Sequence, residues 1–276
     1  MKKKLLARPP LAVPTLLLAV AVLGGAVATM TALAVGAIPL PLGAVLMFIA
    51  GFAAFTPMHD ASHKAVADRG WINALVGRLC AVVLVVPFSA FRYIHLTHHR
   101  HTNDPERDPD FYSGTGPTWQ LPLRWLTQDA TYYSVYFRAD RPRWEKAEAI
   151  GTVVSMLAVI VVLGSTLGWT VVVLGWLLPA RLAIAALAFA FDYLPHHPHE
   201  VPASVDRFQA TRIIESKWLS PVMLCQNYHL VHHLFPGVPF YRYGVVWRAK
   251  RDELMAKGAR VTTFGEATVV ATEATG

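Results

Sequence analysis

Histidines are the residues of this sequence whose type and spacing most clearly suggest chemistry. All twelve fall in four short strings: MHDASH (His59, His63), HLTHHRH (His95, His98, His99, His101), LPHHPHE (His196, His197, His199) and NYHLVHH (His229, His232, His233). Residues three or four positions apart share one face of a helix. His59 and His63 are therefore expected to point one way, as are the three histidines of each HxxHH string, whereas His101 falls on the opposite face.

Eight convergent imidazoles predict two metal ions. Structural zinc takes four ligands and catalytic zinc usually takes three from the protein, so eight ligands exceed the need of one ion. Imidazole binds iron, copper, zinc and nickel, and the spacing does not choose among them. The sequence has neither the HExxH string of a metalloprotease nor the Glu-x-x-His pattern of soluble carboxylate di-iron bundles. Cys80 and Cys225 form no thiolate cluster.

The segments that must position these histidines are apolar enough to cross a membrane. The 276-residue chain is 54% hydrophobic and 16% charged, against about 25% charged in soluble domains. No charged residue lies between Arg8 and Asp60, or between Glu148 and Arg181. Since a crossing needs about 20 apolar residues, we predict an all-α integral membrane fold with four transmembrane helices in two hairpins, at residues 11–38, 41–58, 149–167 and 169–191.

Two features of these segments allow more than one interpretation. The apolar stretch at residues 74–90 is short for a crossing, so it is a re-entrant segment, an interfacial segment or a helix under the first hairpin. Arg181 interrupts the last predicted helix. It faces the bundle interior or marks a break in the span. The charge is either functional or belongs to a structural arginine that snorkels to the interface or pairs with another helix.

Positive residues predict the orientation of the chain. Lysines and arginines gather in the N-terminal segment, between the hairpins and in the tail, and the hairpin turns have none. The positive-inside rule therefore puts both termini and a helical cap with the histidines on the cytoplasmic side. We predict one domain over residues 1–276, with a cytoplasmic tail at 1–10 and a C-terminal tail at 258–276. A signal peptide is disfavoured, because the first apolar stretch is too long and a second follows.

The histidine strings resemble the signature of the integral-membrane fatty acid desaturase and hydroxylase superfamily, which is HxxxH or HxxxxH followed by two HxxHH strings. HDASH, HLTHHRHTNDPERDPD, FDYLPHHP and QNYHLVHHLFP look closest to its β-carotene hydroxylase branch, over residues 55–243. The resemblance implies two non-haem iron ions that use O2 and two electrons to oxidise an unactivated C–H bond of a lipid. By position it implies these iron ligands: His59, His63, His95, His98, His99, His196, His229, His232 and His233. His197 and His199 remain alternatives to His196.

Other residues near the strings have two interpretations each. Five aspartates either orient the histidine rings or, in NDPERDPD, belong to a solvated loop: Asp60, Asp104, Asp108, Asp110 and Asp192. Asn227 is a weak ligand or a helix cap. Aromatic residues between 119 and 137 line a substrate path or sit in the membrane interface. The basic segment VVWRAKRDELMAKGAR docks an external electron-transfer protein such as a ferredoxin or meets anionic lipid headgroups.

The expected function is therefore O2-dependent oxidation of a lipid, with ring hydroxylation of β-carotene favoured and fatty acyl desaturation as the alternative. The expected partners are the lipid-soluble substrate, the electron donor and membrane lipid. The net charge of +7 follows from the topology and needs no nucleic acid. A histidine-rich metal transporter, the alternative from another class, predicts histidines along a path through the spans, whose central parts have none. A hydrolytic zinc site is also a weak alternative, because it requires an open metal with three protein ligands and a nearby carboxylate base.

Overall fold

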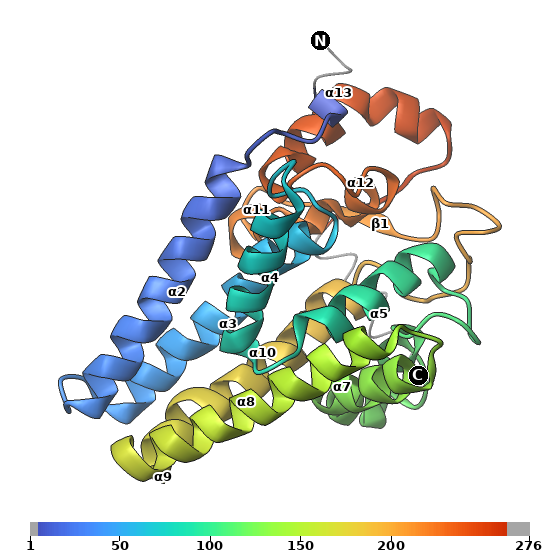
Figure 1. Ribbon diagram of the computed structural model, residues 1–276. Coiled ribbons are helices and arrows are strands. Elements are labelled where there is room, and N and C mark those ends of the chain that lie inside the picture. Colours follow the sequence, from blue (N-terminus) through green and yellow to red (C-terminus); the bar gives the residue numbers. More distant parts are fainter. Residues whose placement is uncertain (1–4, 264–276) are drawn as a thin grey trace.

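The computed structural model describes residues 5–263 and is mostly helical (Figure 1). The parts of the two predicted tails at residues 1–4 and 264–276 lie outside the described residues. Four helical segments are long and apolar enough to cross a membrane: α2 (Val13–Ala34), α3 (Leu40–Ser62), α8 (Arg143–Leu167) and the run Trp169–Tyr193. Their number confirms the four predicted spans within the described part of the chain.

Proline and glycine mark the beginnings and ends of these helices. Pro14 and Pro41 lie in the first turns of α2 and α3, where the missing backbone N–H is tolerated. Gly168 has a φ of +93° between α8 and the next span, a conformation that glycine adopts readily. The starts of α2 and α3 and the turn between α8 and the last span are thus determined by the local sequence.

The last span is continuous but not uniform. It consists of α9 (Trp169–Val172), the π-helical η2 (Val173–Leu177), α10 (Leu178–Leu187) and the π-helical η3 (Ala188–Tyr193). Arg181 in α10 pairs with Asp129 of α7 (Leu121–Arg138), with 2.7 Å between Nη1 and Oδ1. This contact agrees with the structural interpretation of the charge, a helix-paired arginine.

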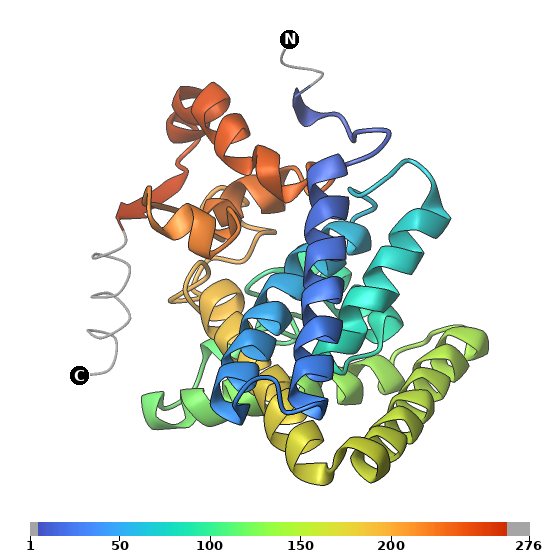
Figure 2. The ribbon, with the colours of Figure 1, turned by 90° about the vertical axis from the view of Figure 1, so that its left-hand side faces the viewer.

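Helix α3 lies at the centre of the bundle and packs against α2, α4 and α10 (Figures 1 and 2). Small buried side chains such as Ala54 and Ala183 fill the space between these helices. A Cβ on Gly51 would lie 3.0 Å from the Cβ of Ala183, so glycine lets α3 and α10 approach closely. The last turn of α3, which holds His59, is thereby surrounded by other helices.

The apolar stretch at residues 74–90 forms most of α4 (Gly70–Leu84) and the start of α5 (Phe88–His101). The two helices are bent by 100° relative to each other. Val85 at the bend has a φ of 60°, and Pro87 directly precedes α5. The bend directs α5 across the end of α3, where its histidines meet those of α3.

A cap that includes β1 (Arg212–Glu215), α12 (His229–Leu234) and α13 (Tyr243–Ala256) lies beyond the ends of α2 and α3 (Figure 1). The remaining helical elements are α6 (Phe111–Gly114), η1 (Thr118–Gln120), α11 (Leu219–Val222), η4 (Gln226–Tyr228) and η5 (Phe240–Arg242). Two strands, β1 and β2 (Arg260–Thr263), form a parallel pair in the register Arg212 to Arg260. This pair departs from the all-α prediction, and β2 lies within the predicted C-terminal tail.

Candidate metal centre

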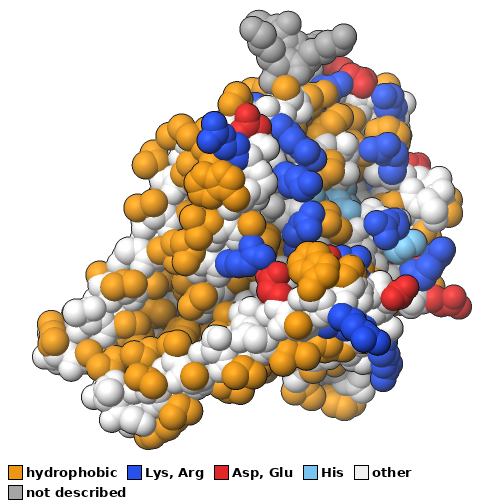
Figure 3. Space-filling view, viewed as in Figure 1, with side chains coloured by type: hydrophobic (Ala, Val, Ile, Leu, Met, Phe, Trp, Pro, Cys, Tyr) orange, Lys and Arg blue, Asp and Glu red, His pale blue; other side chains and the backbone are white. Residues whose placement is uncertain are grey.

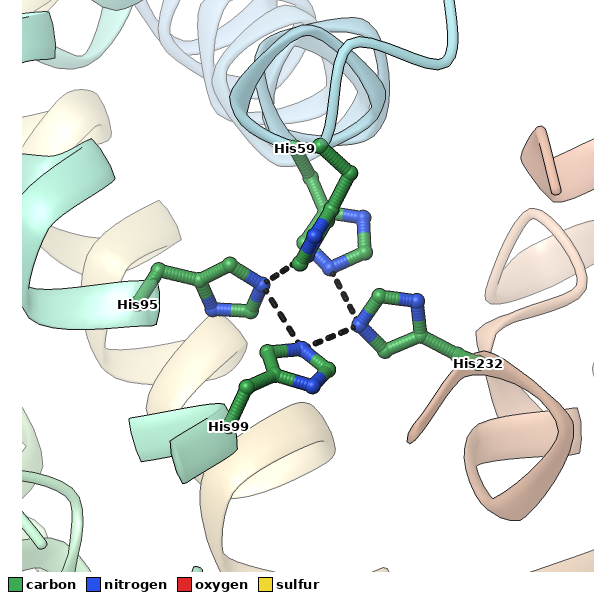
Figure 4. A group of neighbouring side chains, drawn as sticks. His59, His95, His99 and His232 are labelled. Atoms are coloured by element: carbon green, nitrogen blue, oxygen red, sulfur yellow. Dashed lines mark hydrogen bonds between the residues drawn. The ribbon is translucent and has the colours of Figure 1, made fainter. Parts of the chain in front are cut away.

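Five histidines from three helices converge at the end of α3. His59 and His63 come from the end of α3, His95 and His99 from α5, and His232 from α12. One nitrogen of each ring lies within 4.8 Å of those of the other four. Figure 4 shows four of these rings pointing toward a common centre. We call these five residues the first histidine group.

Four further histidines form a second histidine group beside the first. It consists of His98 of α5, His196 in the loop after η3, and His229 and His233 of α12. Neighbouring Nε2 atoms lie 3.0 Å apart between His196 and His229 and 3.1 Å apart between His229 and His233. His98 joins them at 3.3 Å from His233.

The distances between nitrogens in the first group fit a shared cation. The Nε2 atom of His232 lies 2.9 Å from that of His59 and 2.7 Å from that of His99. A neutral ring nitrogen holds either one proton or one lone pair, so it can serve only one such partner. One cation accepts every lone pair at once. Two nitrogens about 2.1 Å from the same ion lie about 3.0 Å apart at a right angle.

Most of these rings are held in the form that binds metals. His98 is the exception: burial lowers its pKa, but Asp108 and Asp110 outweigh this effect and raise the pKa of His98 to about 9. Burial lowers the pKa of His63, His196 and His229 well below the usual range, and neighbouring imidazoles lower it further. These side chains are therefore neutral near pH 7, and a neutral imidazole offers a lone pair to a metal. The donor set of both groups thus fits transition metals that favour nitrogen ligands.

Each HxxHH string contributes to both groups, which the sequence argument did not anticipate. In α5, His95 and His99 belong to the first group and His98 to the second; in α12, His229 and His233 belong to the second and His232 to the first. A helix turns about 100° per residue, so position i+3 points about 60° to one side of i, and i+4 about 40° to the other. The expectation that each trio points one way is wrong for this reason.

Other side chains fix the outer nitrogens of some of these rings. His98 Nδ1 lies 2.8 Å from Asp108 Oδ1 and 3.2 Å from Asp110 Oδ2, and both carboxylates are buried. His232 Nδ1 lies 2.9 Å from the hydroxyl of Tyr243. Such partners orient a metal-binding ring and set which nitrogen holds the proton. Sequence reasoning missed Tyr243, which lies outside all the histidine strings.

The other three candidate aspartates form different contacts. Asp60 accepts hydrogen bonds from the Thr15 hydroxyl (2.8 Å) and the Phe240 amide (3.2 Å), which ties α2 to the cap. Asp104 pairs with Arg107 on the surface, as the loop interpretation predicted. Asp192 accepts from Gln128 Nε2 at 2.6 Å.

The remaining histidines lie outside both groups. His101 follows His99, the last member of the two groups in α5, and is absent from them, as predicted from its face of the helix. His197 and His199 are buried near Tyr193, and burial lowers the pKa of His199 to about 4. Of the three alternatives in PHHPH, His196 is the one that the structure brings to a group. Asn227 donates through Nδ2 to the Ile214 carbonyl at 2.9 Å.

An apolar pocket lies beside both groups. His59 and His95 of the first group and His98 and His229 of the second form part of its wall. Most of the remaining wall is apolar and includes Phe55, Met58, Leu84, Phe91, Leu187 and Phe191. A hydrocarbon group that enters this pocket meets the histidines in apolar surroundings.

One side of this pocket is polar. Tyr132 donates to Asp110, and Gln128 donates to both Tyr132 and Asp192. Burial raises the pKa of Tyr132 well above 10, so its phenol stays protonated. Asp110 also contacts His98, so this network links the pocket wall to the second group. Tyr132 and Tyr133 are the predicted aromatic residues that line the pocket.

A family model described as "Fatty acid desaturase" matches residues 33–265. The chain belongs to the fatty acid desaturase family. It is 33% identical over 192 residues to a "Beta-carotene ketolase" from a Paracoccus species, covering 68% of this chain and 71% of the ketolase. It is 26% identical over 213 residues to an "sn-1 oleoyl-lipid 12-desaturase" from a Picosynechococcus species, covering 66% of this chain and 60% of that desaturase.

Membership of the desaturase family and the four apolar helices make this chain an integral membrane protein. An omega-3 fatty acid desaturase of the endoplasmic reticulum from Vigna radiata is 24% identical over 231 residues, which cover 59% of that enzyme. The chain thus spans about three fifths of the length of the two desaturases. Its clustered histidines supply a metal-binding site of the kind that the resemblance predicts.

Proposed function

We propose that this desaturase-family chain is a membrane oxidoreductase that uses O2 and two non-haem irons to oxidise an unactivated C–H bond of a lipid. The observation that carries the proposal is the pair of histidine groups at the end of an apolar pocket. A lipid chain in this pocket meets the histidine rings directly. The cytoplasmic position of the cap and reduction by an external donor such as a ferredoxin belong to the same proposal.

The residues of the chain have separate tasks in this scheme. His59, His63, His95, His99 and His232 hold one iron, and His98, His196, His229 and His233 hold the other. When bound, the two irons supply O2 activation and the transfer of electrons. Asp108 and Asp110 hold the proton on His98 Nδ1, which leaves Nε2 free as a ligand. Phe55, Phe91 and Phe191 exclude water and hold the substrate.

Oxidation of a β-carotene ring, by hydroxylation, is the favoured reaction. The 33% identity to a β-carotene ketolase supports a carotenoid substrate. Fatty acyl desaturation is the second candidate, because the oleoyl-lipid 12-desaturase is also similar. A metal transporter has no support here, since the nine histidines of the two groups gather at one end of the spans.

Metal analysis of detergent-purified protein tests the centre. We expect about two irons per chain, one for each histidine group. His98→Ala in the second group and His232→Ala in the first should each lower the iron content, whereas His101→Ala, outside both groups, should not. One zinc per chain, or no metal after anaerobic purification, would contradict the proposal.

Expression in a host that produces β-carotene tests the substrate. New hydroxylated pigment that disappears in the His98→Ala variant would support ring hydroxylation. Unchanged pigment together with new double bonds in the acyl chains would instead identify a desaturase. If neither product forms while iron is bound, both candidates fail.

A further inference from the structure

Helix α5 separates the apolar pocket from a second, polar cavity. Ala90, Phe91 and His95 line the apolar pocket. Phe88, Arg92 and Arg100 lie on the other side of the helix and line a cavity between α4, α5 and the start of α8. This second cavity contains no member of either histidine group, so it has no part in the proposed chemistry.

The second cavity has an excess of positive charge. Five cations line it: Lys64, Arg78, Arg92, Arg100 and Arg141. The two acidic residues there are already paired, Glu148 with Arg78 at 2.8 Å and Glu145 with Arg141. Among the described residues, no carboxylate forms an ion pair with Lys64, Arg92 or Arg100. These three cations are available to an anion.

An apolar groove continues from this cavity along the membrane spans. Glu148 lines both, and the groove then runs past Gly151, Ser155 and Val159 of α8, with Val82 and Trp176 on its other wall. Between Glu148 and Val159 it extends about 16 Å along the helix axis. Figure 3 shows this face, where lysine and arginine side chains gather above an apolar hollow between the arms of the molecule.

The cavity lies at the ends of two candidate membrane spans, α3 and α8, where a bilayer would have its headgroups. Lys64 follows the end of α3, and Trp144 stands at the start of α8, both at the boundary of a span. Trp144 is 66% exposed and Trp71 of α4 is 62% exposed, as expected for tryptophans in the membrane interface. Basic pockets between transmembrane helices at this depth bind anionic lipid headgroups.

We propose that an anionic glycerophospholipid occupies this site, with its phosphate against Lys64, Arg92 and Arg100 and an acyl chain in the groove between α4 and α8. The groove decides between possible occupants. A soluble protein reaches the cations but cannot enter a groove along a membrane span, and free phosphate makes no use of it. The lipid would also cover the sparsely buried α8, in which Ala149, Met156 and Gly164 are the buried residues.

Native mass spectrometry of the detergent-purified protein with added phosphatidylglycerol or phosphatidylcholine tests this site. We expect tighter binding of phosphatidylglycerol, and a loss on the order of 10-fold to 100-fold in the Lys64→Gln/Arg92→Gln/Arg100→Gln variant. The matched control, Arg138→Gln/Arg207→Gln/Lys217→Gln, removes the same charge from exposed positions elsewhere and should bind as the unaltered protein does. Equal binding of the two lipids would overturn the proposal.

A second variant tests the groove without changing the cations. A Cβ at Gly151 meets no atom within 4 Å, so Gly151→Phe can fill the groove while the helix stays intact. This variant should weaken the binding of phosphatidylglycerol and leave the three cations in place.

If inorganic phosphate protects against thermal unfolding as well as the lipid does, the site binds phosphate alone. If lipid binding is unchanged and only ferredoxin-driven turnover falls in the triple variant, the surface docks the electron donor. Either outcome would overturn the lipid assignment.

Discussion

The outer nitrogens of the histidine rings are where individual residues control the metal centre. Tyr243 is buried in the cap, and its hydroxyl lies 2.9 Å from His232 Nδ1. His232 in turn faces both His59 and His99 in the first group. A small change at Tyr243 therefore acts on a ring at the centre of that group.

Replacing Tyr243 with Phe removes this hydroxyl and nothing else. We expect the iron affinity of the first group to fall about 10-fold to 100-fold, the usual effect of losing a partner of a ligand ring. Iron retention during dialysis against a chelator of graded concentration measures it. Tyr136→Phe is the control, because Tyr136 is equally buried and its hydroxyl donates to the Glu145 carbonyl, away from the histidines. Equal retention in the two variants would refute the role of Tyr243.

The histidines that gather in the two groups could be predicted from the sequence where their helical spacing brings them together. HxxxH and HxxHH predicted which histidines gather, and the structure brings together the nine that were named. Spacing treated as one shared face could not predict the division into two groups. Asp108 and Asp110 were found because they closely follow the second string, whereas Tyr243 offered no local signal. Asp60 lies next to His59 but points to Thr15.

At the scale of elements, the bend between α4 and α5 decides where three of the proposed ligands lie. Gly77 of α4 faces the ring of Phe88, the first residue of α5. A Cβ at position 77 would lie 2.3 Å from that ring. The contact sets how closely the start of α5 can approach α4.

Gly77→Val should push Phe88 and the start of α5 away from α4. We expect a loss of about 1–3 kcal/mol in stability, as for other overpacked cores, together with a lower iron content. Thermal unfolding in detergent and metal analysis of the same preparation measure both. Gly25→Val, at a position in α2 with no atom within 4 Å of the new Cβ, should change neither. Full iron content in the Gly77→Val variant would contradict this account of the bend.

Charge counting predicted the apolar core of each span but not the helix ends. Helix α8 begins at Arg143 rather than near 149, because Trp144, Glu145 and Lys146 continue the helix outside the apolar layer. The strands β1 and β2 were not predicted, since each has four residues and neither shows a strand pattern long enough to recognise. Their pairing depends on tertiary contacts such as those of buried Ile213 with the cap.

At the scale of the whole molecule, the first span is connected to the cap through one buried carboxylate. Asp60 in α3 accepts from Thr15 in α2 and from the amide of Phe240, which precedes α13. Three distant parts of the chain meet at this residue.

Thr15→Val should leave the Asp60 carboxylate with one partner fewer in a buried site. We expect a loss of about 1–3 kcal/mol, the cost of an unsatisfied buried polar group, measured by thermal unfolding in detergent. Thr31→Val serves as control, because the Thr31 hydroxyl donates to the Val27 carbonyl within α2. If both variants unfold at the same temperature, the tie through Asp60 contributes nothing measurable.

Removal of the metal should loosen the molecule as a whole. The two groups join α3, α5, α12 and the loop after η3, so a bound ion stabilises the folded state in which these segments meet. We expect chelation to lower the unfolding temperature and added iron to restore it. The His98→Ala/His232→Ala double variant should show no such response. An unchanged unfolding temperature after complete chelation would contradict this expectation.

The division of each HxxHH string between the two groups has a consequence for how the centre assembles. Because α5 and α12 each carry histidines of both groups, an ion bound in one group would hold both helices in the positions that the other group requires. The two binding events are then cooperative, and a titration of the metal-free protein should be sigmoidal. Chains with a single bound ion should be scarce at every stage of such a titration.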